Sequence, residues 1–421
     1  MAGPLQGIRV LEFTEIIAGP FAGMLLADMG AEVIKVEPPW GEPWRSNIPF
    51  IPFESRVYIS LNRGKKSLPL DLTKQQAREV VYKLVPHMDV VIINHRPDVP
   101  YNLGIDYETL SAINPRLVYC ENTAYGRRGP HSARPGYDII IQAMSGLMAG
   151  DGKISNGVPQ QVSATAVADY ATGLAIAWGV CGALFARERT GTGQKVEAAL
   201  LATALAVQTN RVLQIDSVDK EARTQFLEDL ALLRSEGRPY PEIYAHYDSL
   251  RPRFASIYYR TFQTKDSVVA VGCLSDRLRK KMADALDLYD SRFEPGYDIT
   301  SDDARAFDEE LSKKAEALFL QKTTDEWVSL LDGAGVPAGP VSFTEELLQD
   351  EQVIANDMVV ELEHTTAGKV RMFGPTLRMS ETPLEARSAS PALGEHTDEI
   401  LNDLGYSQED IQGLKDHGVT R

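Results

Sequence analysis

The chain has little cysteine and no excess of positive charge. Three cysteines, Cys120, Cys181 and Cys273, lie far apart in 421 residues. This spacing fits neither a disulfide framework nor a metal site, so we expect a reducing compartment, the cytoplasm, and no bound metal. Lys and Arg number 43 against 59 Asp and Glu, for a formal charge of -16. Such a surface repels a phosphate backbone, so nucleic acid is not an expected partner.

The chain also lacks the usual signals for export and for membrane insertion. Its first residues contain no basic region followed by an apolar run, so we expect no secretory signal. The one long apolar stretch, 164–186, is rich in small residues and is interrupted by Asp169. A core helix is therefore expected there, and no membrane partner. With 43% hydrophobic and 24% charged residues, the composition is that of a globular protein with two or three domains.

What the sequence does contain is a regular alternation of strand and helix patterns. Apolar runs at 8–13 and 32–36 flank a helix that opens at Pro20, which is a βαβ unit. Further segments continue the pattern, with strands expected at 67–72, 89–93 and 116–120 and a helix at 74–84. This alternation predicts an α/β fold with a doubly wound parallel sheet. No G-x-G-x-x-G follows the first strand, so a dinucleotide site is not expected.

The pattern changes after residue 210. A charged helix is expected at 216–236, followed by a loop-like segment from Arg238 to Pro252. A smaller α+β unit is then expected, with strands at 256–262 and 267–271 and helices at 276–286 and 302–321, and a further strand lies between Val360 and Val370. We therefore divide the chain into 1–215, 216–325 and 326–421.

Asp169 is the most informative residue, because it lies in the apolar run from Ala164 to Trp178. Burying an ionised carboxylate costs several kcal/mol unless it is compensated, so such a residue usually has a function. The helix is expected to end at Gly191, so Asp169 lies near its start, where the helix dipole favours a carboxylate. With the ordinary Asp pKa of about 3.9 it would be an ionised nucleophile at neutral pH. A helix cap or a buried ion-pair partner remains open.

Six motifs occur in order along nearly the whole chain. They are Leu11-Glu12-Phe13-Thr14 with Ala18-Gly19-Pro20, the run from Leu26 to Pro38, Pro135-Gly136-Tyr137-Asp138, the run from Asp169 to Gly173, the run from Arg189 to Gln194, and Gly394-Glu395-His396-Thr397. Each one alone is weak, because several are common helix starts or stops. Together they resemble the class III CoA-transferases, a family that includes formyl-CoA transferase, carnitine CoA-transferase and the α-methylacyl-CoA racemases.

The resemblance implies a fold and a mechanism. It implies a Rossmann-like large domain built from both chain ends, a small domain between them, and an interlocked homodimer. It also implies that Asp169 attacks the thioester of an acyl-CoA, so that an aspartyl-CoA thioester forms and a carboxylic acid acceptor reopens it. Coenzyme A is then substrate and product.

The resemblance assigns CoA contacts to Ile17, Ala18, Leu70, Asn94, Arg96, Arg134, Tyr137 and Asp138. Relatives often carry a phosphate-binding Arg where this chain has Asn102, so Arg96 or Arg134 is expected to substitute. Residues 251–260 contain no glycine, although relatives often carry a mobile glycine loop there. The Arg- and Tyr-rich segment 237–260 fits either the second carboxylate of a dicarboxylic acid or a contact with the partner subunit.

Two alternatives to the transferase remain open. A racemase needs an acid and a base on opposite faces of the α-carbon, and in that branch a His occupies the position of Tyr137. Tyr137 therefore favours the transferase, although His131 lies nearby in what is expected to be a surface turn. A CoA-binding protein without turnover would have no need of Asp169 in a buried helix.

Overall fold

The computed structural model describes residues 2–249, 257–297 and 302–421, with the side chains of 302–305 left out. The chain divides into two compact units, 1–247 with 351–421 and 248–350. These boundaries lie later than the predicted 215/216 and 325/326. The first boundary differs because α11 (Asp216–Ser235) and most of α12 (Tyr240–Ser249) belong with the first unit, and the second differs because residues 326–350 belong with the second unit.

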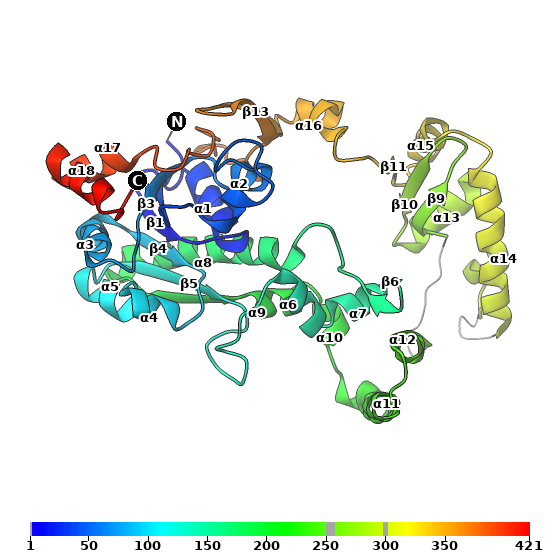
Figure 1. Ribbon diagram of the computed structural model, residues 1–421. Helices are drawn as coiled ribbons and strands as arrows, with labels where there is room; N and C mark the ends of the chain where they lie inside the picture. Colours follow the sequence, from blue (N-terminus) through cyan, green and yellow to red (C-terminus); the bar gives the residue numbers. More distant parts are fainter. Residues whose placement is uncertain (1, 250–256, 298–301) are drawn as a thin grey trace. The chain divides into compact units, whose positions relative to one another are not determined.

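A six-stranded parallel sheet forms the centre of the first unit (Figure 1). Its strands are β1 (Arg9–Phe13), β2 (Glu32–Glu37), β3 (Lys65–Pro69), β4 (Val90–Ile93), β5 (Val118–Thr123) and β8 (Lys195–Ala199). They are arranged in the order β3-β2-β1-β4-β5-β8, which reverses direction between β1 and β4. The predicted α/β fold with a parallel sheet is confirmed, and this order is typical of doubly wound sheets.

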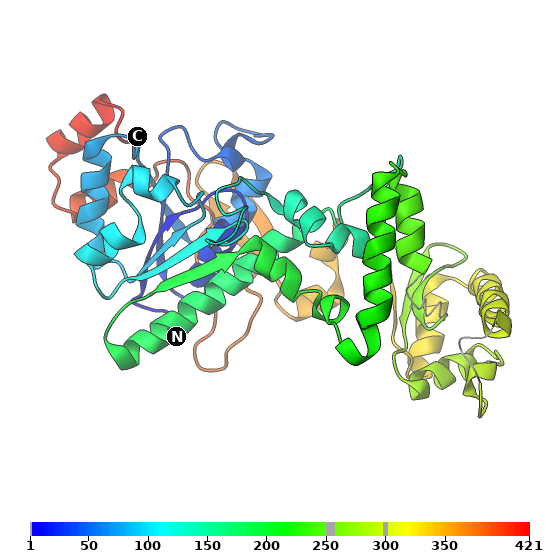
Figure 2. The ribbon, with the colours of Figure 1, turned by 90° about the horizontal axis from the view of Figure 1, so that it is seen from below.

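Helices cover both faces of this sheet, because neighbouring strand residues point to opposite sides. Val10 packs with α1 (Ala18–Asp28) and α8 (Val167–Thr190), whereas Leu11 packs on the other face. That other face is covered by α3 (Gln75–Leu84), α5 (Tyr107–Ile113), α17 (Thr397–Asp403) and α18 (Gln408–Asp416). Figures 1 and 2 show the C-terminal helices α17 and α18, in red, beside α3. Residues from both ends of the chain therefore build one core.

The long helix α8 positions the Asp169 segment. It ends at Gly191, whose φ of 75° provides the left-handed stop that the sequence predicts. Among the described residues it is the one helix long and apolar enough to cross a membrane, yet half of that apolar window is buried inside the fold. Its buried side packs on α1, β5 and β8.

Shorter elements complete the first unit. They are α2 (Arg56–Leu61), α4 (Val99–Leu103), α6 (Asp138–Met144), α7 (Leu147–Asp151), β6 (Ile154–Ser155), β7 (Val158–Pro159), α9 (Leu200–Ala206), α10 (Thr209–Val212), α16 (Glu351–Ala355), β12 (Val359–His364) and β13 (Gly368–Phe373). One expectation is wrong here. Residues 240–249 form α12 instead of a loop, because Pro241 lies in the first helical turn, where its missing N–H has no helical partner to lose. The strand expected between Val360 and Val370 is present as β12, which pairs with β13 in a hairpin.

The second unit is a small α+β fold. Its antiparallel sheet has the order β11-β10-β9, formed by β9 (Tyr259–Gln263), β10 (Val268–Gly272) and β11 (Ala338–Pro340). The helices α13 (Asp276–Ala285), α14 (Asp302–Phe319) and α15 (Thr324–Gly333) accompany the sheet. Its core contains Phe262 stacked on Phe319 at 4.2 Å between ring centroids, with Trp327 beside them. Residues 251–256 of the segment without glycine lie outside the described residues.

Candidate active site

The first part of the candidate site is the turn between β1 and α1. It lies where the strand order reverses between β1 and β4, the usual place for a ligand in an open α/β sheet. Asn94, which follows β4, accepts a hydrogen bond from the Glu15 N–H at 3.0 Å and donates one to the Glu15 carbonyl at 2.7 Å. Asn94 is thereby fixed beside the turn that leads into Ile17 and Ala18.

The second part is the N-terminus of α8, which a residue from another helix caps. The α8 N-cap, Ala166, has no capping side chain. Asp138 on α6 takes this role, since its Oδ1 accepts from the N–H of Ala168 at 2.8 Å and of Asp169 at 3.2 Å. Gln142 donates to the other carboxylate oxygen of Asp138 and accepts from the Val162 N–H at 2.9 Å. This arrangement places two carboxyl groups, Asp138 and Asp169, at one helix end.

Asp169 is 7% exposed, and burial together with the negative charge of Asp138 raises its pKa from 3.8 to about 7. The expectation of an ordinary pKa is therefore wrong, because a buried carboxylate beside another carboxylate is harder to ionise. Among the described residues, none forms an ion pair or a hydrogen bond with the Asp169 carboxylate, and Asp138 does the capping. Among the described residues, the Asp169 side chain therefore neither caps α8 nor forms an ion pair, the two structural roles that the sequence left open.

Close packing of α8 on α1 brings the two parts together. Gly173 lies one helical turn after Asp169, and a Cβ at this position would be only 2.8 Å from the Ala18 carbonyl oxygen. The rings of Tyr170 and Phe21 meet edge to face across the same contact, with centroids 4.9 Å apart. The start of α8 therefore lies beside the start of α1.

The remaining predicted contacts are more dispersed. Leu70 has a core side chain that is 2% exposed, and its N–H donates to the Glu37 carbonyl at 2.7 Å. Arg96 is an exposed residue paired with Asp98 at 3.2 Å. Arg134 is exposed and lies 3.1 Å from His131 Nδ1, whereas Tyr137 precedes α6 and is 64% exposed. The structure thus assembles Ile17, Ala18, Asn94, Asp138 and Asp169 into two adjoining groups and leaves both arginines at the surface.

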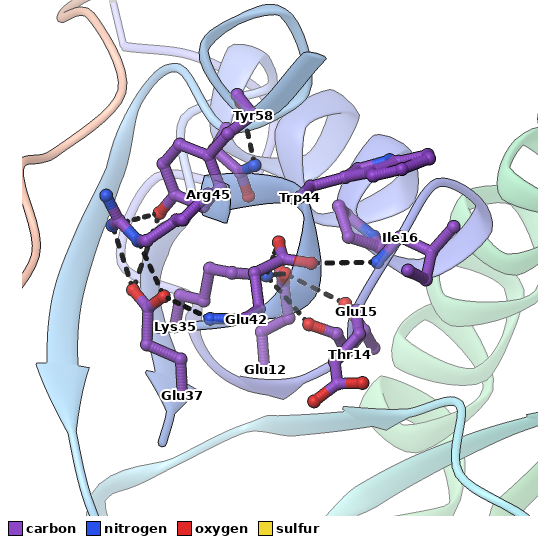
Figure 3. Close-up of polar contacts among 12 residues, drawn as sticks. Glu12, Thr14, Glu15, Ile16, Lys35, Glu37, Glu42, Trp44, Arg45 and Tyr58 are labelled. Carbon is purple, nitrogen blue, oxygen red and sulfur yellow. Dashed lines mark hydrogen bonds and ion pairs between the residues drawn. The ribbon is translucent and has the colours of Figure 1, made fainter. Parts of the chain in front are cut away.

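Sequence reasoning missed a buried network of charged side chains beneath α1 (Figure 3). Lys35 on β2 lies 3.2 Å from Glu12 on β1 and 3.1 Å from Glu42, and all three side chains are fully buried. Lys65 on β3 lies 2.8 Å from Glu12, and burial lowers its pKa to about 8. A signal was present in the sequence, because strands buried on both faces normally consist of apolar residues, whereas these strands carry Glu12, Lys35 and Lys65.

No metal cluster or disulfide accompanies this site in the described part of the chain. No group of three or more His, Cys, Asp or Glu side chains is placed to hold a metal ion there. Cys120, Cys181 and Cys273 are unpaired.

Comparison with known proteins identifies the class. Residues 5–397 match the sequence model of CoA-transferase family III. The succinyl-CoA:glutarate CoA-transferase of Mus musculus is 33% identical over 99% of this chain and 90% of its own length. The formyl-CoA:oxalate CoA-transferase of Rhodopseudomonas palustris is 31% identical over 100% of this chain and 98% of its own length.

Solved structures agree with this. A CAIB/BAIF family protein from Brucella suis is 31% identical and superimposes with a TM-score of 0.74, covering 96% of this chain and 100% of its own. The chain therefore belongs to CoA-transferase family III. As an enzyme of this family it transfers coenzyme A, and CoA thioesters are its substrates.

Proposed function

We propose that the enzyme moves CoA between two carboxylic acids through a covalent aspartyl-CoA thioester on Asp169. The observation that carries this proposal is a buried carboxylate that pairs with none of the described residues and lies where α8 begins, beside the turn between β1 and α1. A carboxylate is a competent nucleophile toward a thioester, because the acyl group moves to oxygen while the thiolate leaves.

The reaction then takes four balanced steps. The Asp169 carboxylate attacks the donor thioester carbonyl, forming a mixed anhydride and expelling CoA thiolate. The thiolate attacks the aspartyl carbonyl, which gives aspartyl-CoA and releases the donor acid. The acceptor carboxylate attacks aspartyl-CoA, forming a second anhydride and expelling the thiolate again. The thiolate finally attacks the acceptor acyl carbonyl, so the new acyl-CoA forms and the Asp169 carboxylate is restored.

The surroundings of Asp169 support this chemistry. A carboxylate whose pKa is about 7 is more basic than an ordinary aspartate, and its burial leaves it little solvated, so the anion is reactive once formed. Asp138 holds the α8 N-terminus and keeps the Asp169 backbone fixed. We assign Ile17, Ala18 and Asn94 to the CoA side of the site.

We propose dicarboxylic acids as the first substrates to test. The names of the relatives from Mus musculus and Rhodopseudomonas palustris state glutarate and oxalate as acceptors. The expectation from the sequence that the Arg- and Tyr-rich segment 237–260 fits a second carboxylate stays a prediction, because residues 250–256 lie outside the described ones. Succinyl-CoA with glutarate and formyl-CoA with oxalate form the initial panel, analysed by mass spectrometry of the acyl-CoA products.

The decisive experiment traps the intermediate. Wild-type protein incubated with acyl-CoA and then hydroxylamine should acquire one hydroxamate, located on Asp169 by peptide mass spectrometry. Asp169→Asn should abolish transfer, while Asp416→Asn, a change in the exposed part of α18, serves as the matched control and should retain full activity. Ordinary turnover by Asp169→Asn would refute the mechanism.

A second activity at the same site, acyl-CoA racemisation, is favoured by one observation. An Asp169 pKa of about 7 suits proton transfer as well as nucleophilic attack. A racemase also needs a second acid or base on the opposite face of the α-carbon, and this chain has Tyr137 where the resemblance places the His of the racemases. Incubating a 2-methylacyl-CoA in D2O separates the two functions, because a racemase introduces deuterium at the α-carbon without an acceptor acid, and a transferase introduces none.

We also propose a homodimer, located in the cytoplasm. In the described chain α11 buries none of its residues, although it carries Val218, Leu227 and Leu232, each more than half exposed. The outer face of α8 presents Trp178 at 80% and Phe185 at 61% exposure. Apolar surfaces of this kind usually mark an interface with a partner, and a second copy interlocked with the first would cover them.

A further inference from the structure

The turn between β1 and α1 contains a strained residue. Ile16 has a φ of 70°, in the left-handed region. For a β-branched residue this conformation is a genuine outlier, because the branched Cβ collides with the backbone. Such strain persists only where the surroundings impose it, and it is concentrated at sites that bind ligands.

Side chains from three directions hold this turn, as Figure 3 shows in part. Glu42 Oε2 accepts a hydrogen bond from the Ile16 N–H at 2.9 Å. Lys35 Nζ donates to the Thr14 carbonyl at 2.7 Å. Asn94 binds both backbone groups of Glu15, as described above. Three consecutive residues, 14–16, are therefore each tied by a side chain from elsewhere in the fold.

Glu42 is itself fixed on both sides. Its second oxygen lies 3.1 Å from Lys35 Nζ, and its N–H donates to Glu37 Oε2 at 3.3 Å. Glu42 is 1% exposed and Lys35 is fully buried. A buried ion pair is a poor source of stability, because desolvation offsets most of the attraction, whereas it fixes geometry well. Burial alone lowers the pKa of Lys35, but the charges of Glu42, Glu12 and Glu37 outweigh it and keep Lys35 protonated.

We propose that Glu42 and Lys35 are positioning residues that impose the strained Ile16 conformation and so aim the backbone of Ile17 and Ala18 at CoA. This inference rests on the proposed function for the assignment of Ile17 and Ala18 to the CoA side. Neither charged side chain contacts the substrate in this proposal. Their effect reaches CoA through the backbone of residues 14–16.

The first test replaces Glu42 and compares it with a matched glutamate of the same network. Glu42→Gln should raise the KM for acyl-CoA about tenfold and leave kcat within about threefold, because binding is lost and chemistry is kept. Glu54→Gln is the control, since Glu54 is 2% exposed, lies 3.4 Å from Arg45 and makes no contact with the turn. Its KM should stay within about twofold of wild type. Equal KM increases in both variants would overturn the proposal.

A second test uses glycine to remove the strain. Glycine adopts a positive φ without penalty, so Ile16→Gly should keep the turn in place when Glu42 is altered. In the Ile16→Gly background, Glu42→Gln should therefore raise KM by no more than about threefold. An undiminished tenfold loss would show that Glu42 acts by some route other than the conformation of Ile16. Glu42→Asp keeps the charge beside Lys35 but shortens its reach to the Ile16 N–H, and it replaces Glu42→Gln if that variant does not fold.

Direct CoA binding separates this inference from the proposed function. Equilibrium dialysis of free CoA with Asp169→Asn and with Asp169→Asn/Glu42→Gln measures the affinity of each protein for CoA in the absence of turnover. About tenfold weaker binding in the double variant supports the positioning role even if no aspartyl-CoA can be trapped in the wild type. Equal binding by both proteins refutes the positioning role even if trapping succeeds.

Discussion

The raised pKa of Asp169 predicts that its carboxyl group destabilises the fold at neutral and alkaline pH. An acid with a higher pKa in the folded than in the unfolded chain is more protonated in the folded state between the two values. Stability is therefore lost as pH rises through that window. For Asp169 the window runs from 3.8 to about 7. Replacing the group by neutral, isosteric Asn removes this dependence.

The magnitude follows from the same values. A shift of about three units corresponds to about 4 kcal/mol once Asp169 is fully ionised. Between about pH 5 and about pH 8 the wild-type protein should lose about 3 kcal/mol more stability than Asp169→Asn. Because every other ionisable group is shared, the difference between the two proteins isolates Asp169, apart from the small effect of its charge on Asp138.

Urea unfolding at both pH values, with equal protomer concentrations, measures this difference. Asp169→Asn should be the more stable protein at the higher pH and should approach the wild type at the lower one. Parallel pH dependences for the two proteins would refute the reasoning. That result would mean that the Asp169 carboxyl ionises in the folded protein as it does in the unfolded chain.

Three further predictions concern the same helix and its surroundings. Asp138→Asn removes the negative charge beside Asp169 and should therefore lower the pKa of Asp169. In a pH–rate profile, the acidic limb of kcat/KM, expected near pH 7 in the wild type, should then move to lower pH. Gly173→Ala should destabilise the protein by about 1–3 kcal/mol in urea unfolding, because the new Cβ would lie 2.8 Å from the Ala18 carbonyl oxygen. Gly182→Ala is the control: a Cβ there would have nothing within 4 Å, so alanine should stabilise the helix by about 1 kcal/mol. Sedimentation should show a dimer that dissociates only as it unfolds, and a folded monomer by circular dichroism would contradict this.

The periodic elements of the fold could be predicted because each is determined locally. Apolar runs identified β1, β2 and β4, and Gly191 marked the end of α8. The α12 helix was missed because Pro239 and Pro241 are typical of loops, whereas in the structure Pro239 precedes the helix and Pro241 lies in its first turn. The unit boundaries depend on which elements pack together, which local patterns do not encode.

The candidate site was predictable only in part. Asp169 was evident because a charge in an apolar helix is unusual, but its pKa was not, since that depends on Asp138, which lies 31 residues earlier. The contacts that impose the Ile16 conformation could not be predicted either. They come from Lys35 within β2, Glu42 after β2 and Asn94 after β4, which reach the turn only in the folded sheet.

The covering of one sheet face by α17 and α18 has a consequence for synthesis. Thr420 donates to the carbonyl of Pro69, 351 residues earlier in the chain. At usual rates of translation the ribosome needs on the order of tens of seconds to make the intervening residues. During that time α17 and α18 cannot yet pack on the face of β1 that carries Leu11. The nascent chain therefore exposes apolar strands to solvent, and to chaperones, for much longer than a domain of contiguous sequence does.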